Sequence, residues 1–557
     1  MANENVFRFG PDGTDASGNL GSQAPVTVSL SGPLLNATDT TFQATNAGFL
    51  ALRDHTTFTE AGSGPLISII GTNSDLSNVS TPSGNFLTLA TGPETTPPVL
   101  TLTNPTGSLL AVTNTNINAG TASANDNTFL FVADGATLAS AGTGPLTTFT
   151  NSSLTSAGNF LTVRRSGTGT SLVNLSGALL SAFNSSFTTF NTVISGGCCA
   201  FLFVGEGGKL QGSGLDALLQ LSNSSFPNIG GSFVNVTPTA NLLDSTPAPS
   251  SITLSGPLMD DTGSTFTIAG SLLRVVDGST FSSTTTVPLM RFSGSTMNAD
   301  SLLFLRGVAT DPSTGLGTQE IFKTGGSILE LSSTTTTPAT RTTVNLTGTG
   351  NAVRVDTALL NASAPIINLI NSTLNTSATG DPTTGAIHLL QSSVTSSLPI
   401  VNVVNNSILT VQNGPLLSLT GGTQMTVTND LISVSGGSQI KVLNGPLIFV
   451  NGGPTATKST LTINGGLLNF ASGTGNQVII NNSIPATRVD TSGNVSIPVS
   501  EIGTGSVVSV TNPTVVNNLA NGSVSVTCKT GCVATNPASL IQVVGGGKVL
   551  IKPSLKP

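Results

Sequence analysis

Short runs of alternating apolar and polar residues recur along the chain and predict β-strands of a few residues each. The segment from Gly414 runs GPLLSLTGGTQMTVTN, then DLISVSGGSQIKVLN, then GPLIFVNGG. Leu416, Leu431 and Leu447 hold corresponding places in these lines, at separations of 15 and 16 residues. Apolar residues stand at every second position of each run, which is the period of a strand with one buried face. The pattern predicts a sequence unit of about 16 residues that contains two short strands.

A second motif precedes the other strand of each unit. It consists of a turn residue, two residues that are mostly Ser or Thr, and then an apolar residue. The final apolar residue is, for example, Leu154, Phe187, Phe226, Phe266, Phe281, Met297, Leu374 or Ile440. The Gly, Asn and Asp residues of these turns tolerate the left-handed backbone that a tight corner requires. We expect the apolar residues, including Phe, to fill a core.

Units of this kind cannot bury an apolar face alone, but stacking lets each strand pair with the same strand of the next coil. Such a stack has parallel sheets around one continuous core. Runs between Gly and Pro residues rarely exceed about six residues, which is too short for a stable helix. A sandwich or barrel also has short strands and turns, but it does not explain one motif that returns at nearly fixed spacing. We predict an all-β chain that forms a single elongated parallel β-solenoid, or β-helix.

Proline spacing leaves the size of one coil open. Several prolines stand directly before the Leu that starts the first strand of a unit, where a missing amide donor costs little. Pro33 and Pro65 are 32 residues apart, and Pro415 and Pro446 are 31 residues apart. One coil therefore contains either one sequence unit with two strands or two units with four strands.

The periodic pattern stops before both ends of the chain. Residues 1–25 contain one strand-like run and a turn rich in Gly and Asp, and residues 500–557 contain longer Val-rich runs. We predict an N-terminal extension at 1–25, a solenoid body at 26–499 and a strand-rich C-terminal segment at 500–557. Each end segment either caps the solenoid or pairs with a neighbouring copy, because an exposed end coil otherwise promotes aggregation.

Composition argues against several kinds of partner. Charged residues make up 8% of the chain, and the formal net charge is −7 with a pI near 4.8. The 18 basic residues are scattered, so the sequence offers no basic stripe for nucleic acid. Trp and Tyr are absent, which argues against a dedicated recognition pocket. No apolar run reaches the roughly 18 residues that a membrane-spanning helix needs, so no membrane span is expected.

Four cysteines form two close pairs. Cys528 and Cys532 can close a small disulfide loop, which fits an oxidising extracellular compartment. Cys198 and Cys199 are adjacent and are expected to be two small buried residues. The first 30 residues lack the basic and apolar regions of a secretory signal, so we expect the signal to lie outside this numbering. The predicted location is extracellular or at a cell surface.

Candidate catalytic residues are few. The two histidines, His55 and His388, are more than 300 residues apart and are expected to be structural. Asp260 and Asp261 are similar to the paired carboxylates of polysaccharide hydrolases, but Thr, Ser and Asn occupy the adjacent units. We expect them to form a polar corner. No cofactor or metal site is expected, because a cysteine pair without further ligands is a poor zinc site.

Two further motifs follow from the same composition. Asn-X-Ser/Thr triplets occur at Asn151, Asn184 and Asn223, but a chain rich in strands and turns contains them without implying glycosylation. Thr-rich stretches such as 334–337 can present Thr in ranks to ice or to a crystalline polysaccharide. Their irregular spacing indicates loop insertions instead.

The segments GPLLSL, GSTFTI and GNFLTV resemble the degenerate repeats of bacterial surface β-helix proteins. That group includes filamentous-haemagglutinin-like adhesins and autotransporter passengers. The resemblance is architectural and covers nearly the whole chain. It implies an exported fibre or surface component.

We therefore expect a structural protein without enzymatic activity that self-assembles end to end into a surface or extracellular filament. Low charge favours self-association, because little electrostatic repulsion opposes it. The expected partner is a further copy of the chain, a surface polysaccharide is a candidate ligand, and nucleic acid is not expected. One alternative is a monomeric adhesin or carbohydrate-binding spike, and a more remote one is a polysaccharide-degrading enzyme.

Overall fold

A computed structural model shows strands and turns, with no α-helix in the described part of the chain. The structure describes residues 6–10, 25–40, 48–71, 73–75, 85–90, 96–119, 128–165, 169–189, 200–238, 248–308, 310–311, 316–317, 319–334, 341–348, 351–376, 385–443, 445–451, 459–481, 507–510, 516–517, 521–527, 541–543 and 548–551.

The chain divides into two compact units, residues 1–285 and 286–557, which we call unit 1 and unit 2. In each unit the strands form four parallel sheets, here named A, B, C and D in the order in which the chain passes through them. Through most of each unit a strand pairs with the strand four places further along the chain. Each unit is thus a parallel β-solenoid, as the repeat pattern predicts.

Unit 1 contributes eight, eight, seven and six strands to the four sheets. Sheet A contains β1 (Phe7–Phe9), β4 (Leu50–Leu52), β8 (Leu87–Leu89), β12 (Leu130–Ala133), β16 (Leu161–Arg164), β20 (Ala200–Gly205), β24 (Ser232–Thr237) and β28 (Ser271–Val276). Sheet B contains β2 (Val26–Leu30), β5 (Thr56–Glu60), β9 (Val99–Leu102), β13 (Thr137–Ser140), β17 (Leu172–Leu175), β21 (Lys209–Gly212), β25 (Ser251–Leu254) and β29 (Thr280–Ser283). Sheet C contains β3 (Leu35–Thr38), β6 (Ile67–Ile70), β10 (Leu110–Thr113), β14 (Thr147–Thr150), β18 (Leu180–Phe183), β22 (Leu219–Ser222) and β26 (Met259–Thr262). Sheet D contains β7 (Asn73–Asp75), β11 (Asn116–Ala119), β15 (Ser153–Ser156), β19 (Ser186–Thr189), β23 (Ser225–Ile229) and β27 (Thr265–Ile268).

Unit 2 repeats this arrangement. Sheet A contains β32 (Ser301–Arg306), β36 (Val353–Asp356), β40 (Ile387–Leu390), β44 (Leu417–Thr420), β48 (Ile448–Val450) and β55 (Ile541–Val543). Sheet B contains β33 (Glu320–Thr324), β37 (Leu359–Ala362), β41 (Ser393–Ser396), β45 (Gln424–Val427), β49 (Thr460–Ile463), β52 (Val507–Val510) and β56 (Lys548–Ile551). Sheet C contains β30 (Met290–Ser293), β34 (Leu329–Ser332), β38 (Ile367–Ile370), β42 (Val401–Val404), β46 (Ile432–Ser435), β50 (Leu468–Ser472) and β53 (Val516–Asn517). Sheet D contains β31 (Thr296–Ala299), β35 (Thr343–Leu346), β39 (Thr373–Thr376), β43 (Ile408–Val411), β47 (Gln439–Val442), β51 (Asn476–Asn481) and β54 (Gly522–Thr527).

One coil contains four strands and therefore two sequence units, which settles the question that proline spacing leaves open. Leu416 and Leu447 lead into β44 and β48, which pair in sheet A. Leu431 leads into β46 of sheet C, on a different side of the coil. All three side chains are fully buried. Successive sequence units thus lie on different sides of one coil, and every second unit stacks in register.

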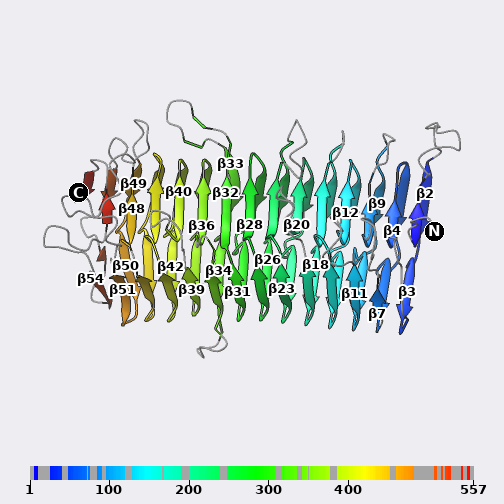
Figure 1. Ribbon diagram of the computed structural model, residues 1–557, viewed down its shortest axis with the longest axis horizontal. Coiled ribbons are helices and arrows are strands. Elements are labelled where there is room, and N and C mark those ends of the chain that lie inside the picture. The colour runs from blue at the N-terminus through cyan, green and yellow to red at the C-terminus, as the bar shows by residue number, and fades with distance from the viewer. Residues whose placement is uncertain are drawn as a thin grey trace. The chain divides into compact units, whose positions relative to one another are not determined.

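The connections between strands differ in length around a coil. In unit 1 the chain passes from sheet A to sheet B within a few residues, as from Leu52 at the end of β4 to Thr56 at the start of β5. Sheets C and D are joined just as tightly, from Thr150 to Ser153. The passage from B to C is longer, from Ser140 to Thr147. Within unit 1, strands of sheets A and B occupy one half of each coil and strands of C and D the other half (Figure 1).

Phenylalanine fills the centre of unit 1. One ring per coil stacks on the next at the start of sheet A, in the order Phe49, Phe86, Phe129, Phe160, Phe201 and Phe233. Ring centroids in this stack are 4.8 to 5.7 Å apart, close to the spacing between strands. A second stack comes from sheet D and contains Phe187, Phe226 and Phe266. Phe149 of sheet C contacts Phe160, so rings from several sides meet in one core, as the apolar pattern predicts.

Both predicted end segments contain strands of the sheets. β1 lies within residues 1–25 and pairs in parallel with β4. In residues 500–557, β52 pairs with β49, and β56 pairs with β52. β54 pairs with β51 over six residues.

Candidate functional site

The turn between sheets C and D carries a ladder of side-chain acceptors, one per coil, and we call it the hydroxyl ladder. In unit 1 it consists of Thr115, Ser152, Ser185, Ser224 and Ser264. The N–H of Ser152 donates to the Ser185 hydroxyl at 3.2 Å, and this hydroxyl donates to the Phe183 carbonyl at 2.9 Å. The ladder of unit 2 includes Thr342, Ser372, Ser407, Ser438 and Asn476. Apart from Ser372, whose buried hydroxyl has no hydrogen-bond partner among the described residues, these side chains satisfy backbone groups that the tight turn leaves without a strand partner.

A similar ladder lies at the turn between sheets A and B. The N–H of Gly207 donates to the Ser250 hydroxyl at 3.0 Å, and the N–H of Ser250 donates to the Ser279 hydroxyl at 3.3 Å. In unit 2, the N–H of Ser392 donates to the Thr423 hydroxyl at 3.3 Å. The two ladders explain the Ser and Thr of the second sequence motif. These hydroxyls bind backbone groups and are therefore structural.

Asparagines form a third ladder, on the surface of the turn between sheets C and D. Asn114, Asn151 and Asn184 all have positive φ, near 50°. The Asn184 amide donates to the Asn151 carbonyl at 3.0 Å, and the Asn151 amide donates to Asn114 at 3.2 Å. Asparagine suits both demands, because it tolerates the left-handed conformation and its amide can donate and accept. The Asn-X-Ser triplets at Asn151 and Asn184 thus coincide with structural turns.

Removing one hydroxyl from this ladder is expected to lower stability. Ser185→Ala deprives the buried N–H of Ser152 of its acceptor, and an unsatisfied buried donor costs about 1–3 kcal/mol. Ser186→Ala changes the adjacent, outward-facing serine and is expected to cost under about 0.5 kcal/mol. The denaturant midpoint and the amide exchange rate of the segment around Ser152 measure the difference. Equal midpoints for the two variants would contradict the structural role of the ladder.

The acidic pair does not form the polar corner that the sequence suggests, and that prediction is wrong. Asp260 and Asp261 lie in the middle of β26, where successive side chains point to opposite faces. Asp260 is half-buried on the outer face, and Asp261 is fully buried beside Leu221 of β22. The structure therefore places the two carboxylates on opposite sides of one sheet, an arrangement that cannot act as an acid and base pair on one substrate.

The histidines lie in different parts of the fold. His55 occupies the turn between β4 and β5 with a φ of 57°. His388 is buried in β40, and its Nε2 is 3.1 Å from the Thr420 Oγ1. The structure does not bring either histidine to the acidic pair of β26.

Other buried carboxylates serve the backbone or an ion pair. Glu60 accepts a hydrogen bond from the N–H of Gly62 at 2.7 Å and another from the Asn104 amide. Asp356 forms an ion pair with Arg354, in which Oδ2 lies 2.7 Å from Nη2. Among the described residues, no three His, Cys, Asp or Glu side chains gather as metal ligands would. Glu60 and the Oδ2 atom of Asp356 therefore have structural partners.

Two arginines lie close together near the first coil of unit 1. Burial lowers the pKa of Arg53 below its ordinary value, and the nearby positive charge of Arg8 lowers it further. The charges of Asp54 and Asp134 act in the opposite direction. A guanidinium remains protonated at neutral pH in any case, so both arginines keep their charge, and the two carboxylates offset it.

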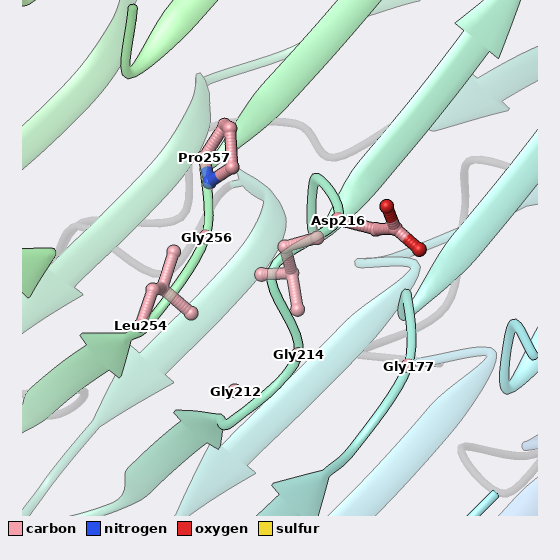
Figure 2. A pocket seen from close by; sticks show the side chains of 8 residues that line it. Gly177, Gly212, Gly214, Asp216, Leu254, Gly256 and Pro257 are labelled. Atoms are coloured by element: carbon pink, nitrogen blue, oxygen red, sulfur yellow. The ribbon is translucent and has the colours of Figure 1, made fainter. Parts of the chain in front are cut away.

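A small notch lies at the bend between sheets B and C. Its volume is about 10 Å³, far below the range of about 300–1,000 Å³ that is typical of ligand pockets. It forms where Gly212 stands in register between Leu175 and Leu254, so one coil lacks a side chain that its neighbours have. Figure 2 shows the Asp216 carboxylate turned away from Gly212 and Leu254. The notch is thus a small gap in the core with no ionised group directed into it.

The first coil of unit 1 is less covered than the second. Phe7 and Val28 are only half-buried, whereas Leu50 and Phe58, their register partners one coil further on, are fully buried. Val6 is 45% exposed. We call the outer side of β1, β2 and β3 the open edge. The sequence pattern does not reveal it, because its apolar residues follow the same alternation as those of the interior coils.

Several residues considered from the sequence lie outside the described part of the chain. These are Cys198, Cys199, Cys528 and Cys532, together with residues 335–337 of the Thr-rich stretch. Thr342, which follows that stretch, belongs to the hydroxyl ladder of unit 2. No helix in the described residues is long and apolar enough to cross a bilayer.

These features define the class of the protein as a parallel β-solenoid repeat protein with coils of four strands. No protein-family model, curated protein or solved structure matches the chain. The strands, their register and their parallel direction show the β-solenoid architecture.

Proposed function

We propose that this chain is an exported structural protein that assembles end to end into a surface or extracellular filament. The open edge carries the proposal. Phe7 and Val28 are partly exposed there, although their equivalents in the next coil are fully buried. Apolar burial contributes about 25 cal/mol per Å², so a further coil placed on this edge is stabilising. The edge strands also have backbone groups that a new strand can bind.

The internal construction of the coils supports a mechanical role. Stacked rings fill the core of unit 1, and buried hydroxyls bind backbone groups at turns between sheets A and B and between sheets C and D in both units. Such a core resists bending, because each coil is hydrogen-bonded to its neighbours. The proposal assigns no catalytic residue.

Purified protein is expected to form long unbranched fibres whose amount rises with concentration, because end-to-end contacts follow mass action. Negative-stain images and sedimentation measure this. Particles with the 55.8 kDa mass of a single chain at every concentration would remove the filament proposal. Fractionation of the producing cells tests export, and the protein is expected in the envelope or medium fraction.

A monomeric carbohydrate-binding surface is the second candidate, and one observation favours it. The outward positions of β15 and β19 are Ser153, Thr155, Ser186 and Thr188, which form two short ranks of uncharged hydroxyls. Hydroxyls can donate to and accept from sugars, although aromatic stacking platforms are missing. Co-sedimentation with insoluble polysaccharide, by protein that remains monomeric, distinguishes this candidate from a filament.

A further inference from the structure

The backbone of the open edge is directed alternately toward and away from the solenoid. In β2, the Val26 N–H donates to the His55 carbonyl at 2.9 Å, and the Leu30 carbonyl accepts from the Ala61 N–H at 2.9 Å. Successive residues of a strand direct their backbone groups to opposite sides. The N–H and C=O groups of Thr27 and Ser29 therefore face away from β5.

The same alternation holds in β1. The Phe7 N–H donates to the Phe49 carbonyl at 2.8 Å, and the Phe9 carbonyl accepts from the Arg53 N–H at 2.9 Å. Arg8, between them, therefore directs its backbone away from β4. Strands β1, β2 and β3 each stand first in their sheets, and β2 and β3 lie one above the other at the blue end of unit 1 (Figure 1).

The last strands of unit 2 offer a matching edge. β55, β56 and β53 each stand last in sheets A, B and C, and each pairs in parallel with one described neighbour. Both units pass through the sheets in the order A, B, C, D. A second copy that is added head to tail keeps this order and the parallel direction, so A meets A, B meets B and C meets C.

A joint between two open edges does not have this match. Such a joint has a two-fold axis, which makes the strands antiparallel and reverses the order of the sheets around the coil. When sheet A of one copy then lies on sheet A of the other, sheet B of one copy lies on sheet D of the other. Only a head-to-tail joint extends sheets A, B and C together, and it leaves a free edge at each end for further copies.

Charge also favours unlike ends. Residues 1–40 contain four acidic residues and one basic residue, namely Glu4, Asp12, Asp15, Asp39 and Arg8. Residues 501–557 contain one acidic residue and four basic residues, namely Glu501, Lys529, Lys548, Lys552 and Lys556. Opposite net charge attracts an N-terminal segment to a C-terminal segment, and like charge opposes contacts between identical ends.

From these observations we infer that the open edge binds the C-terminal edge of a second copy by parallel strand addition, with β55 beside β1, β56 beside β2 and β53 beside β3. The resulting filament is polar, with one open edge at one end. This inference rests on the proposed filament function and specifies its partner and geometry.

Proline at an outward-facing backbone position tests the joint. Ser29→Pro removes the N–H that faces the second copy and leaves the hydrogen bonds of Val26 and Leu30 to the next coil in place. Ser29→Ala keeps the N–H and is the matched control. The proline variant is expected to form no fibres alone, and the alanine variant is expected to form fibres like the unchanged chain.

Mixing separates a polar joint from other modes of assembly. The proline variant retains its C-terminal edge, so it is expected to add to the open edge of growing fibres and block that end. A small fraction of the variant should therefore shorten fibres of the unchanged chain several-fold, whereas the alanine variant should not. Fibres of unchanged length in the mixture, or normal fibres of the proline variant alone, would overturn the inference and leave the filament function standing.

Amide exchange in the unchanged chain tests the same joint without any substitution, so the result does not depend on how a variant folds. Exchange of the Thr27 and Ser29 amides is expected to be at least about tenfold slower in fibres than in free chains. Equal exchange rates would overturn the inference. Discrete dimers would indicate the two-fold joint, and the absence of fibres would remove the proposed function as well.

Discussion

Phe160→Ala is expected to destabilise unit 1 by about 3–5 kcal/mol, because it leaves a large cavity in a close-packed core. Phe160 is fully buried, and its ring contacts four other phenylalanine rings. The Phe201 ring stacks on it at 4.8 Å, and the Phe149 and Phe187 rings meet it at steep angles. Coils above and below support these rings, so the cavity cannot close by moving one side chain. The denaturant midpoint and the exchange rates of neighbouring strands measure the loss.

Phe183 provides a matched control. It ends β18 with 50% of its surface exposed, so Phe183→Ala removes a side chain of the same size from outside the core. We expect a loss of under about 1 kcal/mol. Similar losses for the two variants would show that the stacked rings do not stabilise the solenoid, and the assignment of the core would be wrong.

Gly177→Ala is expected to be the second most damaging substitution, with a loss of about 1–3 kcal/mol or more. Gly177 lies at the bend between sheets B and C, where a Cβ atom would lie 2.0 Å from the Gly144 carbonyl oxygen of the preceding coil. This neighbour is backbone and is held by the coil below, so a rotamer change cannot relieve the contact. The two coils would have to move apart. Thermal and denaturant midpoints measure the effect.

Gly64 is the corresponding control, because it occupies the same place in a similar sequence. Ser63, Gly64, Pro65 and Leu66 match the residues from Ser176 to Leu179, except that Pro replaces Ala. A Cβ atom at Gly64 would meet nothing within 4 Å. Gly64→Ala is therefore expected to be neutral or to stabilise by about 0.4–1 kcal/mol, since it restricts the unfolded chain. A loss equal to that of Gly177→Ala would contradict the close approach of successive coils.

Local chemistry accounts for the parts of the structure that the sequence predicts well. Leu416 and Leu447 recur where an apolar side chain must enter the core, and Asn151 and Asn184 recur where the backbone needs positive φ. These requirements belong to single strands and turns, so they produce a repeating pattern of residue types in the sequence. The Ser of the second motif is also visible, although only the structure shows that it binds the N–H of the preceding coil.

The candidate chemistry was less predictable. Adjacent Asp residues suggest a pair, but strand alternation separates Asp260 on the outer face from the buried Asp261. The sequence did not fix the start of the strand closely enough to decide which face each carboxylate takes. A shift of one residue exchanges the two faces.

By itself the sequence determined that the chain forms short parallel strands in stacked coils, with Phe and Leu inside, left-handed turns at Asn and Gly, and little charge outside. Only the tertiary structure decided that a coil takes two sequence units, that Leu416 stacks beneath Leu447 while Leu431 lies in another sheet, and that the first coil keeps an open edge. The reason is physical. The alternation of apolar residues and the chemistry of the turns act within one strand and its turns, so they are the same for every sequence unit. Stacking depends on which side chains meet across coils. Those contacts are determined only when the whole cross-section closes around its core.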